Sequence, residues 1–159
     1  MAQFGGPKLV KKLHFEDEAK SKLTVGINKI ASAVSSTLGA SGRTVVIEDD
    51  FGNPHVTKDG VTVANSIMLR NPVENLGVAM IKQAAQQTAN IAGDGTTTSI
   101  VLAQAIIESY TKYKGEDYSF RDIKLGINTY KDHIVKILED KAIQIDDDRL
   151  DDVSTISAN

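Results

Sequence analysis

Apolar side chains recur at three- and four-residue steps along most of this 159-residue chain, which is the spacing of amphipathic helices. The pattern predicts helices over about residues 17–38, 60–67, 72–92, 97–112 and 119–138. Gly39, Gly42 and Gly93 mark helix ends, and Pro72 suits the first turn of a helix. The predicted buried face of the 72–92 helix is Val73, Leu76, Met80, Ile81, Ala84, Ala85, Thr88 and Ile91. That of the last long helix is Phe120, Ile123, Ile127, Tyr130, Ile134 and Leu138.

One segment follows the pattern of strands instead. A β-branched run at 44–47, a turn cluster at 50–54 and an extended piece at 55–57 are typical of a β-hairpin with a loop longer than two residues. Residues 1–15 show little periodicity, and we expect an N-terminal arm or short strand there. The predicted fold class is mainly α: a helical bundle with one small β-hairpin.

Two features of the C-terminal third refine this picture. Ser119, with Asp122 three positions on, predicts a capping box. Five aspartates within residues 146–152 predict a solvated loop and a helix start, where carboxylates suit the helix dipole.

Composition narrows the function classes. The formal charge is -3, which argues against non-specific nucleic-acid binding. There is no cysteine, so disulfides and thiolate metal sites are excluded. No apolar run reaches the ~18 residues of a membrane span, and no secretory signal is evident near the N-terminus. We therefore expect a cytoplasmic protein that binds neither nucleic acid nor membranes.

The stretch Gly93-Asp94-Gly95-Thr96-Thr97-Thr98 stands where one predicted helix ends and the next begins. Backbone N–H groups at a helix start lack internal partners and favour anions. The glycines let the backbone approach a ligand, and the hydroxyls can donate to phosphate oxygens. Asp94 suits such a site if Mg²⁺ lies between its carboxylate and a phosphate. The alternative, a helix that ends at glycine followed by a threonine N-cap, remains equally open at this point.

Two other stretches have similar chemistry. Residues 37–43 form a helix end with two glycines and free hydroxyls, and residues 57–64 place Lys58 and Asp59 on a turn before a helix. Lys58 could neutralise phosphate charge, and Asp59 could orient a water or hold an ion. Each stretch alone is more often an ordinary turn, but three such helix junctions together suggest one shared anion site. No Walker A loop or G-x-G-x-x-G occurs, and the three histidines lack metal-ligand spacing.

Together, "TLGASGRTVVIEDDFGNPHVTKDGVTVA", "ENLGVAMIKQAA", "AGDGTTTSIVLAQAII" and "STISAN" resemble, in order and spacing, the group I chaperonins of the GroEL/Hsp60 family. The resembling part is the N-terminal half of the equatorial, ATP-binding domain, and it identifies residues 16–159 with that half-domain. The resemblance implies ATP as ligand and Mg²⁺, with K⁺, as metal.

The resemblance also implies a set of site residues. Asp94 is the implied Mg²⁺ ligand, and Asp59 is the predicted catalytic residue, which orients an ion or water. Ala40 stands where the family usually has proline, which leaves the loop without a fixed φ. The implied nucleotide-binding residues are Thr37, Leu38, Gly39, Ala40, Lys58, Gly60, Asp94, Gly95, Thr96, Thr97, Thr98, Ile156 and Ser157.

Complete members of the resembled family are much longer, so we expect a truncated chaperonin. The missing parts would include the domain that binds client proteins and the co-chaperonin, and the aspartate that positions the attacking water. The family is an ATPase, but this fragment alone is expected to hydrolyse ATP negligibly. Expected partners are ATP and other chaperonin subunits or itself as a homo-oligomer, with clients and co-chaperonin only in a full-length form. Two alternatives are a self-associating interaction module without nucleotide activity and a modulator that joins full-length rings.

Overall fold

The computed structural model describes residues 15–39, 41–49, 51–113 and 118–157. The predicted arm therefore lies outside the described residues except for Phe15, as do Ala40 and part of the hairpin turn. In chain order, the elements are α1 (Glu16–Ser35), β1 (Val45–Glu48), β2 (Pro54–Thr57), α2 (Gly60–Ser66), α3 (Pro72–Ala92), α4 (Thr96–Tyr113), α5 (Phe120–Lys141), the 3₁₀ helix η1 (Asp147–Arg149) and α6 (Leu150–Ser157). The predicted fold class, mainly helical with a small two-stranded sheet, is confirmed.

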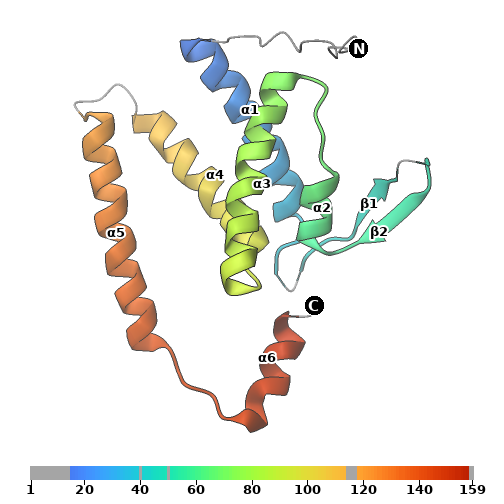
Figure 1. Cartoon of the computed structure of the whole chain (residues 1–159), viewed down its shortest axis with the longest axis vertical. Coiled ribbons are helices and arrows are strands. Elements are labelled where there is room, and N and C mark those ends of the chain that lie inside the picture. Colours follow the sequence, from blue (N-terminus) through green and yellow to red (C-terminus); the bar gives the residue numbers. More distant parts are fainter. Residues whose placement is uncertain (1–14, 40, 50, 114–117, 158–159) are drawn as a thin grey trace, which may run out of the picture. The chain divides into compact units, whose positions relative to one another are not determined.

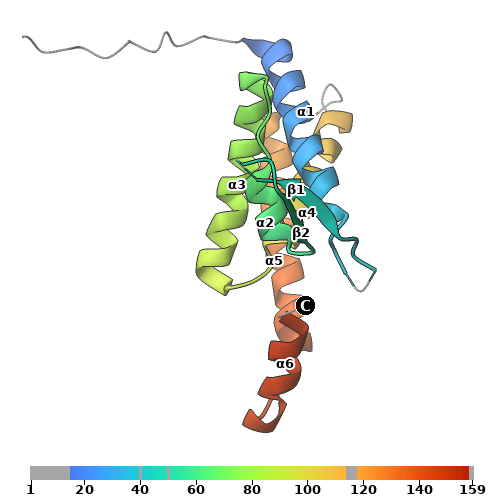
Figure 2. The same ribbon diagram turned by 90° about the vertical axis from the view of Figure 1, so that its right-hand side faces the viewer.

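The chain divides into two compact units, residues 1–104 and 105–159, with the division inside α4. In the first unit α1 and α3 lie side by side (Figures 1 and 2), and α2 packs against α1. Two glycines allow α1 and α3 to approach so closely. A Cβ at Gly26 would lie 2.7 Å from the carbonyl carbon of Glu74, and one at Gly77 would lie 3.1 Å from that of Leu23. The two helix backbones are therefore in direct contact.

The core of the first unit is aliphatic. Its largest fully buried side chains are Ile30, Val34, Val63, Val78 and Ile100, from α1, α2, α3 and α4. The predicted buried face of α3 is partly wrong: Leu76, Met80 and Ile91 are more than half exposed. The buried positions are instead Val73, Gly77, Val78, Ile81 and Ala85. The face is rotated because the contact with α1 is centred on Gly77, a residue that a count of apolar side chains leaves out.

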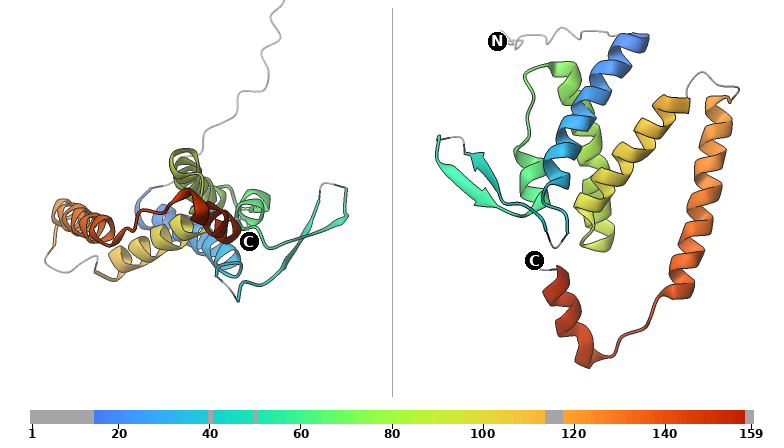
Figure 3. Two further views of the ribbon diagram at one scale, coloured as in Figure 1. Left: turned by 90° about the horizontal axis from the view of Figure 1, so that it is seen from below. Right: turned by 180° about the vertical axis from the view of Figure 1, so that it is seen from behind.

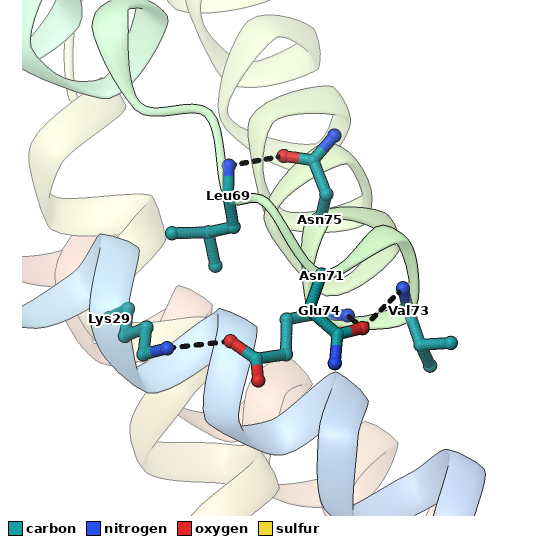
Figure 4. A network of polar contacts seen from close by, with 6 residues as sticks. All are labelled: Lys29, Leu69, Asn71, Val73, Glu74 and Asn75. Atoms are coloured by element: carbon teal, nitrogen blue, oxygen red, sulfur yellow. Dashed lines mark hydrogen bonds and ion pairs between the residues drawn. The ribbon is translucent and has the colours of Figure 1, made fainter.

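Both ends of α3 are fixed by local signals. The Asn71 side chain accepts from the N–H groups of Val73 and Glu74, as N-caps do. Gly93 ends the helix in the left-handed conformation, φ 76°, as predicted. Glu74 also forms an ion pair of 2.6 Å with Lys29 of α1 (Figure 4), which ties the start of α3 to its neighbour.

The hairpin pairs β1 and β2 antiparallel, with Val46 opposite Val56 and Ile47 opposite His55. It extends away from the helices of the first unit in both views of Figure 3. Its turn is held by Asp49, whose carboxylate accepts from the backbone N–H groups of Phe51 and Asn53. These bonds, led by that from Asn53, lower the pKa of Asp49.

The second unit holds α5, η1 and α6. Ser119 and Asp122 form the predicted capping box at the start of α5, and the Tyr110 and Phe120 rings meet edge to face at a centroid distance of 6.0 Å. The aspartates 147, 148, 151 and 152 lie in first helical turns, as predicted. The predicted buried face of α5 is wrong, since no residue of this helix is buried. The sequence does give α5 an apolar side, but among the described residues most of that side is exposed, and Phe120 is in contact with the Tyr110 ring of α4.

Candidate functional site

The first turn of α4 presents the backbone donors that the sequence predicts. The N–H of Ser99 donates to the carbonyl of Gly95 at 2.9 Å, which is the first helical bond of α4. The N–H groups of the three threonines before Ser99 therefore precede the helical ladder. Thr96 is buried, Thr97 is half-buried and Thr98 is exposed. The alternative of a threonine N-cap is wrong, because Gly95 occupies the capping position.

The loop that leads into α4 depends on two glycines with positive φ. Gly93 has φ 76° and Gly95 has φ 86°, values that other residues adopt at a cost. Between them Asp94 is exposed, and its Oδ1 accepts from the N–H of Gly95 at 2.6 Å. A Cβ at Gly93 would have nothing within 4 Å, so there is open space beside this loop.

The start of α2 carries Lys58, Asp59 and Gly60. Asp59 is the N-cap of α2, and its carboxylate accepts from the N–H of Val61 and from both the N–H and the hydroxyl of Thr62. Partial burial alone would raise the pKa of Asp59, but these hydrogen bonds outweigh it and hold the pKa below its ordinary value. Lys58 is exposed. Asp59 is thus ionised and fixed in direction at neutral pH.

Three of the predicted segments meet at Gly60. A Cβ at this residue would overlap the Oγ1 of Thr97 and would lie 3.1 Å from the Oγ1 of Thr37. Thr97 belongs to the first turn of α4, and Thr37 follows the end of α1. The start of α2, the start of α4 and the turn after α1 are therefore in contact, and Gly60 is buried between them.

The turn after α1 is compact. The N–H of Gly42 donates to the carbonyl of Gly39 at 2.9 Å, and the N–H of Arg43 donates to that of Ser36 at 2.7 Å. Gly39 has φ 77° and is exposed, as is Leu38. The expectation of a free hydroxyl is wrong for Thr37, because its hydroxyl donates to the carbonyl of Val34 at 2.7 Å. That hydroxyl satisfies the end of α1 and keeps only its acceptor capacity for a ligand.

Two predicted residues, Ile156 and Ser157, lie in α6 of the second unit. Ile156 is exposed. Their assignment to the site stays a prediction, as does that of Ala40, which lies outside the described residues.

A hydroxyl pair that the sequence analysis missed anchors α4. The Ser99 hydroxyl donates to the Thr88 hydroxyl of α3 at 2.9 Å, so the first turn of α4 is fastened to α3. Thr88 was assigned to an apolar face. The amino-acid sequence gives no sign of this bond, since the partner of Thr88 lies eleven residues further on, in another helix.

The donor set fits Mg²⁺ only in company with a phosphate. Within the described ranges, no group of three or more His, Cys, Asp or Glu side chains could hold a metal ion by itself. Asp94 offers one carboxylate beside a cluster of amide and hydroxyl donors. Mg²⁺ is commonly bound through one or two carboxylates together with substrate phosphates and water, so these residues fit a metal–phosphate pair rather than a bare ion.

Similarity to known proteins identifies the family that has this helical fold and this glycine-threonine loop. The model of the TCP-1/cpn60 chaperonin family matches residues 30–159, and the chain belongs to that family. It is similar to the chaperonin gp146 from bacteriophage EL 2 (Pseudomonas aeruginosa), solved in the presence of ATP-BeFx, with 29% identity and a TM-score of 0.71. It is also similar to a group III chaperonin in the open state, with 25% identity and a TM-score of 0.69.

The chain spans only part of these relatives. The likeness covers 82% of this chain and 22% of the phage chaperonin, and 80% of this chain and 25% of the group III chaperonin. In the part of the chain that the structure describes, no helix has the length and apolarity needed to cross a membrane.

Proposed function

We propose that this chain supplies the phosphate- and metal-binding part of the ATP site of a chaperonin that folds client proteins. The observation that carries the proposal is the contact of three segments at Gly60, which brings together the turn after α1, the start of α2 and the first turn of α4. The crystallisation of a similar chaperonin with ATP-BeFx supports ATP as the ligand.

Each residue then has a role that follows from its position. The N–H groups and hydroxyls of Thr97 and Thr98 donate to phosphate oxygens, and the exposed ammonium of Lys58 neutralises phosphate charge. Asp94 holds Mg²⁺, with K⁺ as an accompanying cation, and the metal supplies charge neutralisation on the phosphates when it is bound. Phosphoryl transfer to water requires positioning and electrostatic stabilisation rather than covalent chemistry from the protein.

A second carboxylate of the proposed site, that of Asp59, is next to Lys58, but it is engaged as the N-cap of α2. We therefore assign Asp59 to the orientation of an ion or water rather than to proton abstraction. A 159-residue polypeptide of this sequence should accordingly bind Mg-ATP and turn it over far more slowly than complete chaperonins do.

Finer assignments belong to the same proposal. We assign the chain to the group I, GroEL/Hsp60-like chaperonins because its loop motifs resemble that group, and to the cytoplasm. In a full-length form, its partners would be other chaperonin subunits, unfolded clients and a co-chaperonin, with ATP binding and hydrolysis driving the folding of clients.

The direct test is Mg-ATP binding to the Asp94→Asn variant, measured by isothermal titration calorimetry with Mg²⁺ and with EDTA. The amide keeps an oxygen that can accept from the Gly95 N–H but loses the charge that a metal needs. We expect wild type to bind Mg-ATP at least about tenfold more tightly than the variant, a difference of about 1.4 kcal/mol. In EDTA the variant should bind ATP at least as tightly as wild type, because without the metal the Asp94 carboxylate repels the phosphates.

The matched control is Asp151→Asn, which makes the same charge change at an exposed position in α6. It should bind Mg-ATP as wild type does. Equal affinity of wild type and Asp94→Asn for Mg-ATP would contradict the metal assignment, and no binding by wild type would contradict the proposed function.

A second candidate function is a self-associating interaction module without nucleotide activity. It is favoured by the exposed apolar side of α5, where Phe120 is 67% and Tyr130 is 72% exposed. Large apolar surfaces on proteins commonly mark interaction sites. The two candidates differ in whether Mg-ATP binds and in whether changes in α5 alter the oligomeric state.

A further inference from the structure

Lys82 lies in the middle of α3, within the stretch ENLGVAMIKQAA, and none of the site roles given above involves it. Its Nζ donates to the carbonyl of Asn65 at 3.0 Å and to the carbonyl of Ile67 at 2.8 Å. The side chain is half-buried, and this burial lowers the pKa of Lys82. A partly desolvated ammonium is tolerated where it has hydrogen-bond acceptors, and the two carbonyls supply them.

The two carbonyls belong to the end of α2. Asn65 is in its last turn, and Ile67 is its C-cap. Carbonyls at a helix end lack partners within the helix, and lysine is a favourable residue to satisfy them. At the other end of α2, Asp59 caps the first N–H groups. The helix is thus held at its start by its own cap and at its end by a side chain of α3.

The two bonds of Lys82 tether the end of α2 to α3, and this tether also affects the segments proposed to bind phosphate, which are the start of α2 and the loop before α4. The helix α2 has seven residues and is about 10 Å long at 1.5 Å per residue, so a shift at its end moves its start as well. That start is Gly60, in contact with Thr97 of α4. The other helix of the tether, α3, continues directly into the Gly93–Gly95 loop.

Resting on the proposed function, we propose that Lys82 is a positioning residue for the ATP site. By tying the end of α2 to α3, it sets where Lys58, Asp59 and Gly60 lie against the first turn of α4. It touches no phosphate itself, and its effect on binding is exerted through α2.

The test is Lys82→Met in the 159-residue chain, with Lys29→Met as matched control. Each change removes one ammonium that bonds to another element. Lys82 bonds to the end of α2, and Lys29 bonds to the start of α3. Lys29, however, joins α1 to Glu74 of α3 and leaves α2 untouched. Melting temperatures, Mg-ATP affinity well below melting, and hydrogen exchange of the α2 amides are measured for both.

We expect both variants to melt at a lower temperature, but only Lys82→Met to bind Mg-ATP about tenfold more weakly, a loss of about 1.4 kcal/mol. Lys29→Met should stay within about twofold of wild type. Lys82→Arg should restore binding, because a guanidinium can also donate to two carbonyls. Exchange should accelerate at residues 61–66 in Lys82→Met and not in the control.

Wild-type affinity in Lys82→Met, or an equal loss of affinity in Lys29→Met, would overturn the positioning role while leaving the proposed function intact. If wild type itself bound no Mg-ATP, the proposed function would fail. Hydrogen exchange would then show whether Lys82 holds α2 in place. In that case, unchanged exchange at residues 61–66 in Lys82→Met would overturn the tether, and selective acceleration there would support it.

Discussion

Gly60 has room for a hydrogen and not for a methyl group, and the obstacle is the pair of hydroxyls that defines the candidate site. We expect Gly60→Ala to destabilise the protein by about 1–3 kcal/mol, as overpacking of a close contact does, and to weaken Mg-ATP binding. Urea unfolding and calorimetry measure the two effects. The Thr97→Ala change removes the Oγ1 that the new Cβ would overlap, so the double variant should lose less stability than the sum of the single variants.

The control for this prediction is Gly126→Ala in α5, where a Cβ would have nothing within 4 Å. There the same change should leave Mg-ATP binding unaltered and favour the helix by up to about 1 kcal/mol. A Gly60→Ala variant as stable as wild type, with the same nucleotide affinity, would contradict the contact between Gly60 and Thr97.

Asp59 makes stability depend on pH. Its pKa is lowered in the folded state, so its contribution is present above the unfolded-state pKa of about 3.9 and is lost as pH falls through the lower, folded-state value. Asn is as good an N-cap residue as Asp but does not titrate. We therefore expect wild type to lose stability relative to Asp59→Asn as the pH is lowered from about 5 to about 2.

Urea unfolding midpoints of the two proteins across this range provide the measurement. Asp49, whose pKa is also lowered, is present in both proteins and cancels in the difference. Parallel curves for wild type and variant would show that the Asp59 carboxylate is not held as the structure places it.

At the level of the secondary-structure elements, we expect the close contact of α1 and α3 to be the least tolerant of a larger side chain. A Cβ at Gly77 would meet the backbone of Leu23 rather than a movable side chain. We expect Gly77→Ala to lower the free energy of unfolding by more than Gly60→Ala does, because two helices must separate rather than one hydroxyl rotate. Urea unfolding of both variants decides the order, and a smaller loss for Gly77→Ala would contradict it.

The helices and the hairpin could be predicted to within a few residues because their signals are local. Asn71, Pro72 and Gly93 set the ends of α3, and the Ser119 box sets the start of α5. The buried face of α3 could not be predicted from apolar periodicity, since it is built around Gly77, which has no side chain to count. The periodicity of α5 indicates an apolar side correctly, but periodicity does not state what covers that side.

The candidate site likewise has some features that the sequence predicts and others that it does not. The loop motifs are enough to predict which residues would carry phosphate and metal chemistry, because glycine conformation, hydroxyls and helix starts are local properties. The contact of Gly60 with Thr97, the bond of Ser99 to Thr88 and the tether of Lys82 join segments that are distant in sequence. Such contacts follow from packing, and no spacing in the chain encodes them.

For the molecule as a whole, the exposed apolar side of α5 predicts self-association. Ile134 is 51% and Leu138 is 62% exposed, one turn apart on the same side of the helix. We expect the average mass of the wild-type chain, measured by light scattering, to rise with concentration both with and without Mg-ATP. Glutamates at these two positions should reduce the association with little cost to folding, because substitutions at exposed positions rarely destabilise by more than about 0.5 kcal/mol.

The control variant places glutamates at Asn128 and Thr129, two exposed positions of the same helix, so that charge is added equally without removing apolar surface. It should associate as wild type does. A chain that stays monomeric at every concentration would refute the interaction module. Association that needs Mg-ATP and survives the α5 changes would point instead to nucleotide-driven assembly through other surfaces, as expected of a chaperonin subunit. Light scattering on these three proteins therefore tests the interaction module, and calorimetry with Mg-ATP tests the nucleotide site.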